Sequence, residues 1–237
     1  MRLTVLGNNG PYPAKGGRCS GYLFESDSGH TAVLLDCGPG ILAELQKHLH
    51  PSTLAGIILS HLHYDHMSDM LPLHYALQFN PPLRPLNVYA PKQPESVRNM
   101  LAGDHVDVWP MENTVIGEMK LSFCPVTHPI ETYAVSIECD RTRFVYTGDT
   151  NTDAGLELFC DGADVLMADC GLSAADYTLI SPHLSSVLCG KLARDTGVRR
   201  LLLTHFNPKY DPQELCAEAR MYFPDSEITV PGECYYL

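Results

Sequence analysis

The sequence lacks the features that mark several whole classes of protein. No apolar run among its 237 residues approaches the roughly 20 that a membrane helix needs, and the N-terminus has no long apolar stretch of the kind found in signal peptides. It has no internal repeat, low-complexity tract or C-x-x-C pair. The nine cysteines are scattered and odd in number, which favours reduced thiols over disulfides. We therefore expect a cytoplasmic protein that makes no membrane contact.

Basic residues are also few. The formal net charge is -12, and Arg199-Arg200 is the only adjacent basic pair. Extended contact with nucleic acid would need a local basic patch, which this pattern does not provide. Hydrophobic residues make up 45% and charged residues 19% of the chain, a composition typical of a packed globule. The length fits a single domain over residues 1–237.

The hydrophobic pattern predicts alternating strands and helices. An N-cap at Ser181 with Pro182 after it predicts a helix ending at Gly197, and Asp211-Pro212 predicts another. Strands come in meanders as well as crossovers, which favours an α/β fold of two mixed sheets with helices on their outer faces. The predicted strands are Leu3–Leu6, Gly21–Glu25, Thr31–Leu35, Ile57–Leu59, Asn87–Ala90, Lys120–Val126, Ala134–Glu138, Arg143–Tyr146, Val165–Ala168 and Leu201–Thr204.

The densest chemical feature is the run from Ser60 to Met67, which contains His61, His63, Asp65 and His66. It follows directly on the buried strand Ile57–Leu59, so these side chains belong to a loop at the carboxyl edge of a sheet. Packed together without a ligand, three histidines and a carboxylate would lack polar partners. The run therefore predicts a metal site.

Three further candidates repeat this placement, because each follows an apolar strand. They are His128 after Val126, Asp149 after Tyr146, and His205 after Thr204. Any one of them alone could be an ordinary turn residue. Together with the histidine run they predict one convergent site.

The order H-x-H-x-D-H, lone His, Gly-Asp-Thr and Thr-His-Phe resembles the metallo-β-lactamase superfamily over nearly the whole chain. That resemblance implies an αββα sandwich with two metal ions at the sheet edges. It assigns His61, His63 and His128 to the first ion, Asp65, His66 and His205 to the second, and Asp149 as the bridge between them.

The donor set suits two divalent transition-metal ions, with zinc favoured and manganese, iron or nickel as alternatives. Two ions about 4 Å apart can share a hydroxide and stabilise charge that develops on a substrate. Asp65 is a candidate catalytic residue that would orient or deprotonate the attacking water.

Differences from particular branches of this family limit the reactions that the resemblance implies. A lactam-cleaving branch would show Cys at Asp149, and a di-iron oxygen-reducing branch would show Glu at His63. The segment Leu203–Tyr210, preceded by His183, resembles ribonuclease Z and its small relatives. Only 21 positions separate His128 from Asp149, which leaves no room for the arm with which ribonuclease Z grips tRNA.

The leading hypothesis is a phosphodiesterase for a small or flexible phosphodiester, such as a cyclic nucleotide or an oligonucleotide end. The alternatives are a thioester or lactone hydrolase and a tRNA 3′-processing endoribonuclease. His183 is the candidate proton donor, with a pKa that a helix N-terminus would lower. We expect specificity to lie in loops such as Asn8–Ser20 and Leu71–Pro85, and a homodimer is left open.

Overall fold

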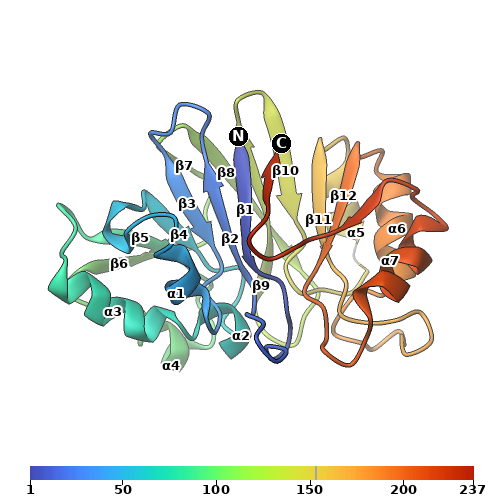
Figure 1. The fold of residues 1–237 in the computed structure, drawn as a ribbon, viewed down its shortest axis with the longest axis horizontal. Coiled ribbons are helices and arrows are strands. Elements are labelled where there is room, and N and C mark those ends of the chain that lie inside the picture. The colour runs from blue at the N-terminus through green and yellow to red at the C-terminus, as the bar shows by residue number, and fades with distance from the viewer. Residues whose placement is uncertain (153) are drawn as a thin grey trace.

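The computed structural model, which describes residues 1–152 and 154–237, consists of two stacked mixed sheets (Figure 1). In both sheets antiparallel pairing in one part gives way to parallel pairing in the other. The first sheet has the order β14 (Cys234–Tyr236), β1 (Arg2–Gly7), β2 (Gly21–Glu25), β3 (Ala32–Leu35), β4 (Gly56–Ile58), β5 (Leu86–Tyr89), β6 (Val106–Trp109). The second has the order β13 (Ser226–Ile228), β12 (Arg200–Thr204), β11 (Val165–Asp169), β10 (Thr142–Tyr146), β9 (Thr132–Cys139), β8 (Met119–Val126), β7 (Thr114–Ile116).

Alternation along the strands builds the core between the sheets. Tyr22 and Phe24 on β2 point inward, whereas Leu23 between them points toward the helices on the outer face. Phe24 meets Phe144 of the second sheet with ring centroids 4.7 Å apart, and Tyr22 meets Tyr146 at 5.5 Å. Because such aromatic pairs add to the free energy of burial, these contacts fix how the two sheets lie against each other.

Helices cover both outer faces (Figure 1). Apolar side chains of α1 (Ile41–Leu45) and α3 (Met70–Phe79) pack on the first sheet, and those of α5 (Ala154–Cys160), α6 (Ser186–Asp195) and α7 (Pro212–Arg220) pack on the second. Short helices α2 (Tyr64–Met67) and α4 (Glu95–Arg98) and the 3-10 turn η1 (Pro51–Thr53) complete the first half. In the described part of the chain no helix is long and apolar enough to cross a membrane.

The structure confirms two mixed sheets flanked by helices and corrects two local predictions. The predicted loop Leu71–Pro85 is helical as far as Phe79, because Pro72 lies in the first turn of α3, where the missing N–H has no acceptor to lose. Helix α6 begins after Ser185, whose side chain accepts a hydrogen bond from the N–H of Leu188, rather than after Ser181.

Candidate metal centre

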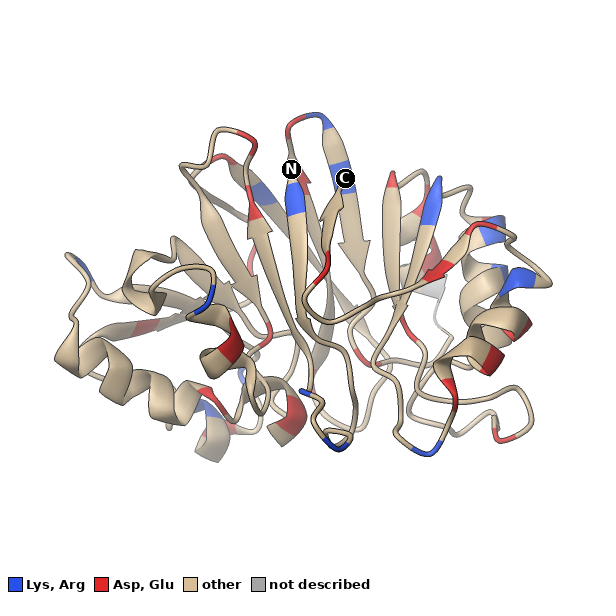
Figure 2. Cartoon of the chain, viewed as in Figure 1, with Lys and Arg blue, Asp and Glu red and all other residues tan. Residues whose placement is uncertain are grey.

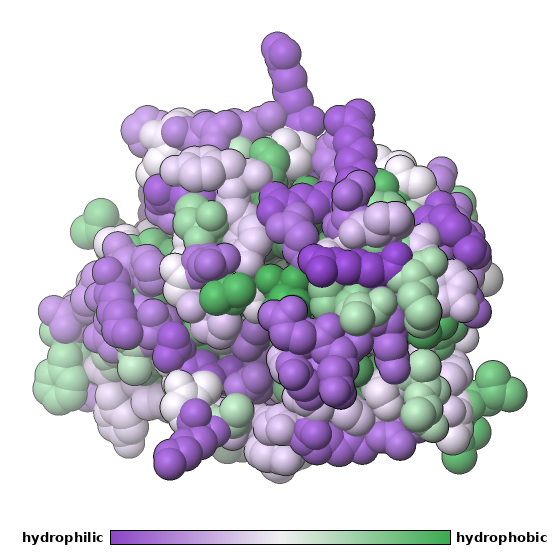
Figure 3. All heavy atoms as spheres, turned by 45° about the vertical axis from the view of Figure 1, so that its right-hand side comes forward, coloured by the Kyte–Doolittle hydropathy of each residue, from purple (hydrophilic) through white to green (hydrophobic). Residues whose placement is uncertain are grey.

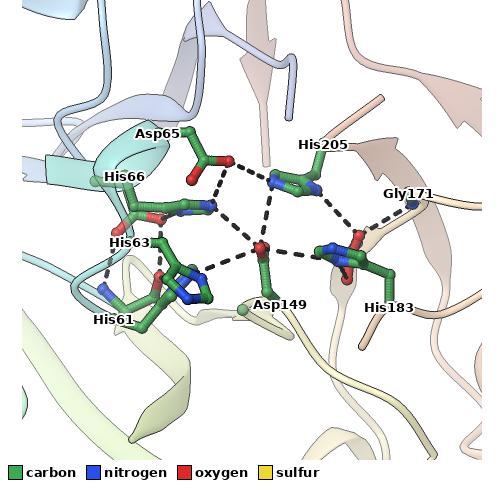
Figure 4. Close-up of polar contacts among 12 residues, drawn as sticks. His61, His63, Asp65, His66, Asp149, Gly171, His183 and His205 are labelled. Atoms are coloured by element: carbon green, nitrogen blue, oxygen red, sulfur yellow. Dashed lines mark hydrogen bonds and ion pairs between the residues drawn. The ribbon is translucent and has the colours of Figure 1, made fainter. Parts of the chain in front are cut away.

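All seven predicted metal ligands gather at one edge of the two sheets, and Figure 4 labels all of them except His128. The loop after β4 carries two of them and α2 carries two more, while the ends of β8, β10 and β12 deliver one each. The first sheet thus supplies four ligands and the second sheet three. The ligands in chain order are His61, His63, Asp65, His66, His128, Asp149 and His205.

The first donor group consists of three imidazoles and a carboxylate. His63 Nδ1 lies 3.1 Å from His61 Nε2 and 3.1 Å from His128 Nε2. Asp149 Oδ2 lies 3.6 Å from His61 Nε2. Four potential ligand atoms therefore converge on one small volume.

The second donor group shares Asp149. Its Oδ2 atom lies 3.3 Å from His66 Nε2 and 3.3 Å from His205 Nε2, and His205 Nε2 lies 3.1 Å from Asp65 Oδ2. Within each group all ligand atoms lie within 4.8 Å of one another. Because one carboxylate belongs to both groups, the geometry fits the bridging role that the family resemblance gave to Asp149.

Buried polar atoms that lack hydrogen bonds support a metal at this place. Among the described residues, none makes a hydrogen bond to the buried Asp149 Oδ1. His66 Nε2, also buried, makes none either and has only the ion-pair neighbours Asp149 and Asp65. An unsatisfied buried polar group destabilises a fold, and native proteins contain few of them. Both atoms belong to side chains of the two donor groups, so the residues present fit a bound cation.

Protonation favours ligation in the first group. Burial lowers the pKa of His61 well below its ordinary value, and burial also lowers the pKa of His63 and His128, so these imidazoles are neutral. Burial by itself would raise the pKa of Asp149, but the imidazoles of His205, His66 and His61 lower it well below the ordinary range. Neutral imidazole and ionised carboxylate are the forms that bind metals.

The second group holds protons that a cation would replace. Burial lowers the pKa of His66 and His205, but the surrounding carboxylates outweigh it, raising the first well above its ordinary value and the second to about 10. Burial raises the pKa of Asp65, and His66 and His205 more than reverse that effect. Metal binding here would therefore release protons.

Asp36 supports the centre and was missed by the sequence analysis. Its Oδ1 accepts the N–H of Ser60 at 2.8 Å, and its Oδ2 accepts the hydroxyl of Ser60 at 2.9 Å and pairs with His66 Nδ1 at 2.8 Å. It is fully buried and lies in the left-handed region with φ 58°. A partner of this kind fixes the orientation of a ligating imidazole. Its position after a buried strand, shared with the ligands, was the available signal.

His183 lies at the centre, held by Asp169 at the end of β11. The Nδ1 of His183 lies 2.9 Å from Asp169 Oδ2. Burial lowers the pKa of His183, but Asp169 outweighs it and raises the pKa above its ordinary value. The predicted lowering by a helix end is wrong, because His183 precedes α6 instead of lying in its first turn. Asp169, which also faces His205 Nδ1 at 3.3 Å, was not predicted.

The loop Asn8–Ser20 closes over the second donor group. Gly10 donates its N–H to Phe206 O at 3.2 Å, and Phe206 donates its own to Asn8 O at 2.8 Å. A Cβ on Gly10 would overlap the ring of His205 at Nε2, its ligand atom. Only glycine therefore allows this loop to lie so close to His205.

A cavity of about 350 Å³ opens onto the ligands. That volume falls in the usual range for a small-molecule site. The residues that line it are Pro11, His63, Tyr64, Asp65, His128, Pro129, Asp149, Pro182 and His183.

Comparison with known proteins yields matches over almost the whole chain. A family model described as the β-lactamase superfamily domain matches residues 31–206. The probable metallo-hydrolase YhfI of Bacillus subtilis is 30% identical over 97% of this chain and 96% of its own. An uncharacterized protein of Mycobacterium leprae is 31% identical over 99% of this chain and 88% of its own.

Solved structures agree on the fold. The crystal structure of YhfI from Bacillus subtilis has a TM-score of 0.93 at 29% identity, covering 99% of this chain and 98% of that one. The short form of human tRNase Z has a TM-score of 0.79 at 18% identity, covering 100% and 99%, a likeness that concerns the fold alone. The predicted metallo-β-lactamase fold is confirmed.

Proposed function

The chain belongs to the metallo-β-lactamase superfamily of metal-dependent hydrolases, and from this premise we propose that it hydrolyses a small or flexible phosphodiester. A cyclic nucleotide or an oligonucleotide end is the kind of substrate meant. The observation that carries the proposal is His183, an imidazole at the cavity whose proton is stabilised by a buried carboxylate.

The two donor groups would hold two divalent transition-metal ions, for which we propose zinc. His61, His63 and His128 would bind one, Asp65, His66 and His205 the other, and Asp149 both. When bound, such ions polarise a phosphoryl oxygen and lower the pKa of water. Asp65 lines the cavity beside His63, which supports the proposal that its carboxylate orients an attacking water.

A proton donor at His183 favours a phosphodiester over a thioester as the substrate. Asp169 holds its Nδ1, and no described residue bonds its Nε2, so Nε2 is the atom that would give a proton to the departing oxygen. An alkoxide leaves poorly without such a proton, whereas a thiol of pKa about 8.5 leaves readily as a thiolate. A protonated imidazole is therefore more useful for a phosphodiester than for a thioester.

Charge indicates a small substrate. Lys and Arg lie on both halves of the molecule (Figure 2), and neither lines the cavity. With a net charge of -12 the chain repels polyanions at long range. Strands β9 and β10 occupy the interval between His128 and Asp149, as the sequence predicted, and leave no segment there for an arm.

We also propose that the protein works in the cytoplasm. All nine cysteines are free, and most of them are buried. A reducing compartment suits such thiols.

The deciding experiment is an activity screen on protein reloaded with zinc or manganese. The substrates are bis(4-nitrophenyl) phosphate, cyclic AMP, an acyl thioester, a lactone and a lactam, each with and without chelator. We expect chelator-sensitive hydrolysis of the phosphodiesters and none of the lactam. Faster turnover of the thioester or the lactone would instead support the alternative hydrolases.

A further inference from the structure

Tyr64 is a large aromatic side chain at the mouth of the metal centre with no evident part in folding. It lies between the ligands His63 and Asp65, lines the cavity and is 73% exposed. Among the described residues, no hydrogen-bond partner is found for its hydroxyl. Most of this side chain is therefore available to a ligand.

The position of Tyr64 relative to the ligands is fixed by its backbone. The N–H of Ser68 donates to Tyr64 O at 3.1 Å, and the hydroxyl of Ser68 donates to the same oxygen at 2.5 Å. His63 and Asp65 on either side are constrained by the cluster that they form. With the backbone held, a tyrosine side chain has only two χ angles to order when it contacts a ligand, so the loss of conformational entropy is small.

Apart from His183 and the candidate ligands, prolines form the rest of the cavity wall beside Tyr64. Pro11, Pro129 and Pro182 come from three separate segments, and neither Lys nor Arg lines the cavity. Contacts to the part of a substrate that lies away from the ligands and His183 are therefore mainly apolar. A planar ring is the group that a tyrosine ring and proline rings contact best.

We propose that Tyr64 is a specificity-determining residue that stacks on the nucleobase of a nucleotide phosphodiester. The inference rests on the proposed function and assigns recognition of the heteroaromatic base of such a substrate to this residue. Because every base offers a π-face, purines and pyrimidines should both be accepted.

Exposure alone does not single out Tyr64 as a binding residue, because other large apolar side chains are exposed as well. On the face shown in Figure 3, small groups of hydrophobic residues lie among hydrophilic ones, as on most soluble proteins. Tyr75 on α3 is 66% exposed but does not line the cavity. It is the matched control, because its loss removes a similar surface away from the ligands.

The kinetic arm compares two substrates with the same reacting group. Cyclic AMP and the 3′,5′-cyclic phosphate of methyl riboside differ only in the base. For cyclic AMP we expect Tyr64→Ala to lower kcat/KM about 5- to 150-fold, the loss associated with removal of one stacking contact. The base-free substrate should be unaffected, Tyr64→Phe and Tyr64→Trp should keep most of the rate, and Tyr75→Ala should change neither substrate.

The binding arm needs no turnover. Calorimetry on the zinc-loaded protein compares AMP with ribose 5-phosphate, and Tyr64→Ala should weaken only AMP. If the wild type cleaves neither cyclic substrate, the proposed function fails while this arm still tests Tyr64. Equal losses for both members of a pair, no loss at all, or wild-type protein that binds AMP no more tightly than ribose 5-phosphate would overturn the proposal.

Discussion

Gly10→Ala tests whether the loop Asn8–Ser20 and the second donor group fit together as closely as the structure shows. The added Cβ would lie within 3.0 Å of three ring atoms of His205, a separation that real Cβ atoms essentially never show. Either the loop or the imidazole must move. His205 Nε2 now lies 3.1 Å from Asp65 Oδ2 and 3.3 Å from Asp149 Oδ2, so a displaced ring loses the other donors of its group.

The magnitude follows from what is disturbed. Misplacing the support of a ligand lowers metal affinity about 10- to 100-fold, and overpacking destabilises a fold by about 1–3 kcal/mol. The first donor group contains neither Gly10 nor His205, so it should keep its affinity. At limiting zinc we expect occupancy to fall from about two ions per chain to about one.

Gly16→Ala is the matched control. Gly16 lies in the same loop with φ 75°, and nothing lies within 4 Å of the Cβ that would be added. This variant strains the backbone by about 1–2 kcal/mol without touching a ligand. It should therefore be less stable than the wild type and still bind both ions.

The assay is elemental analysis after dialysis against graded zinc, with thermal unfolding as the stability measurement. A Tm loss of ~2–4 °C for each kcal/mol is expected of both variants. If Gly10→Ala bound two ions with wild-type affinity, the contact between the loop and His205 would not be as close as described. If Gly16→Ala also lost one ion, loop strain rather than steric intrusion would be the cause.

Four further predictions test other contacts. Asp149→Ala should lower metal content at both donor groups; elemental analysis that shows loss from one group only would contradict its shared position. His183→Ala should keep its metals and lose about 10²–10⁴-fold in rate on a poor leaving group but less on 4-nitrophenolate, and equal losses would remove its role as proton donor. Burial raises the pKa of Glu44, but Lys47 and Arg18 outweigh it and lower the pKa below the ordinary 4.5. The ionised Glu44 therefore stabilises the fold above pH 4.5, and this stabilisation is lost as the pH falls through the pKa of the folded state. Urea unfolding should accordingly show Glu44→Gln weaker by about 0.5–1 kcal/mol near pH 7 and by less near pH 3; a pH-independent difference would refute this. Precursor tRNA should be cut poorly in a gel assay at moderate salt, and efficient 3′ cleavage would reveal a basic surface that the charge distribution does not suggest.

That the seven candidate ligands gather in one place could be predicted because each follows an apolar strand, and strand ends of a mixed sheet meet at one edge. Asp36 follows a strand in the same way, but a single carboxylate in a Gly-containing turn looks like turn chemistry. Only the fold shows that it reaches Ser60 and His66. Asp169 was missed for a similar reason. Its partner His183 follows 14 residues later in the chain, after a loop whose path no hydrophobic periodicity describes.

The predicted start of α6 was wrong because two nearby segments carry a helix-start signal. Ser181-Pro182 and Ser185 are both acceptable helix starts, and the choice between them depends on tertiary contacts. Leu172 O accepts the N–H of Ser186, the first residue of α6. This contact with the segment after β11 favours the start at Ser185. The pKa of His183 was mispredicted as a consequence, because moving the helix start removes the dipole and leaves Asp169 as the dominant neighbour.

The aromatic contacts between the sheets also affect the candidate metal centre. The first sheet supplies His61, His63, Asp65 and His66 and the second supplies the other candidate ligands. Packing of Phe24 against Phe144 between the sheets therefore bears on how far apart the two sets of ligand atoms lie. We expect Phe24→Leu to change that separation and to weaken metal binding while the chain stays folded.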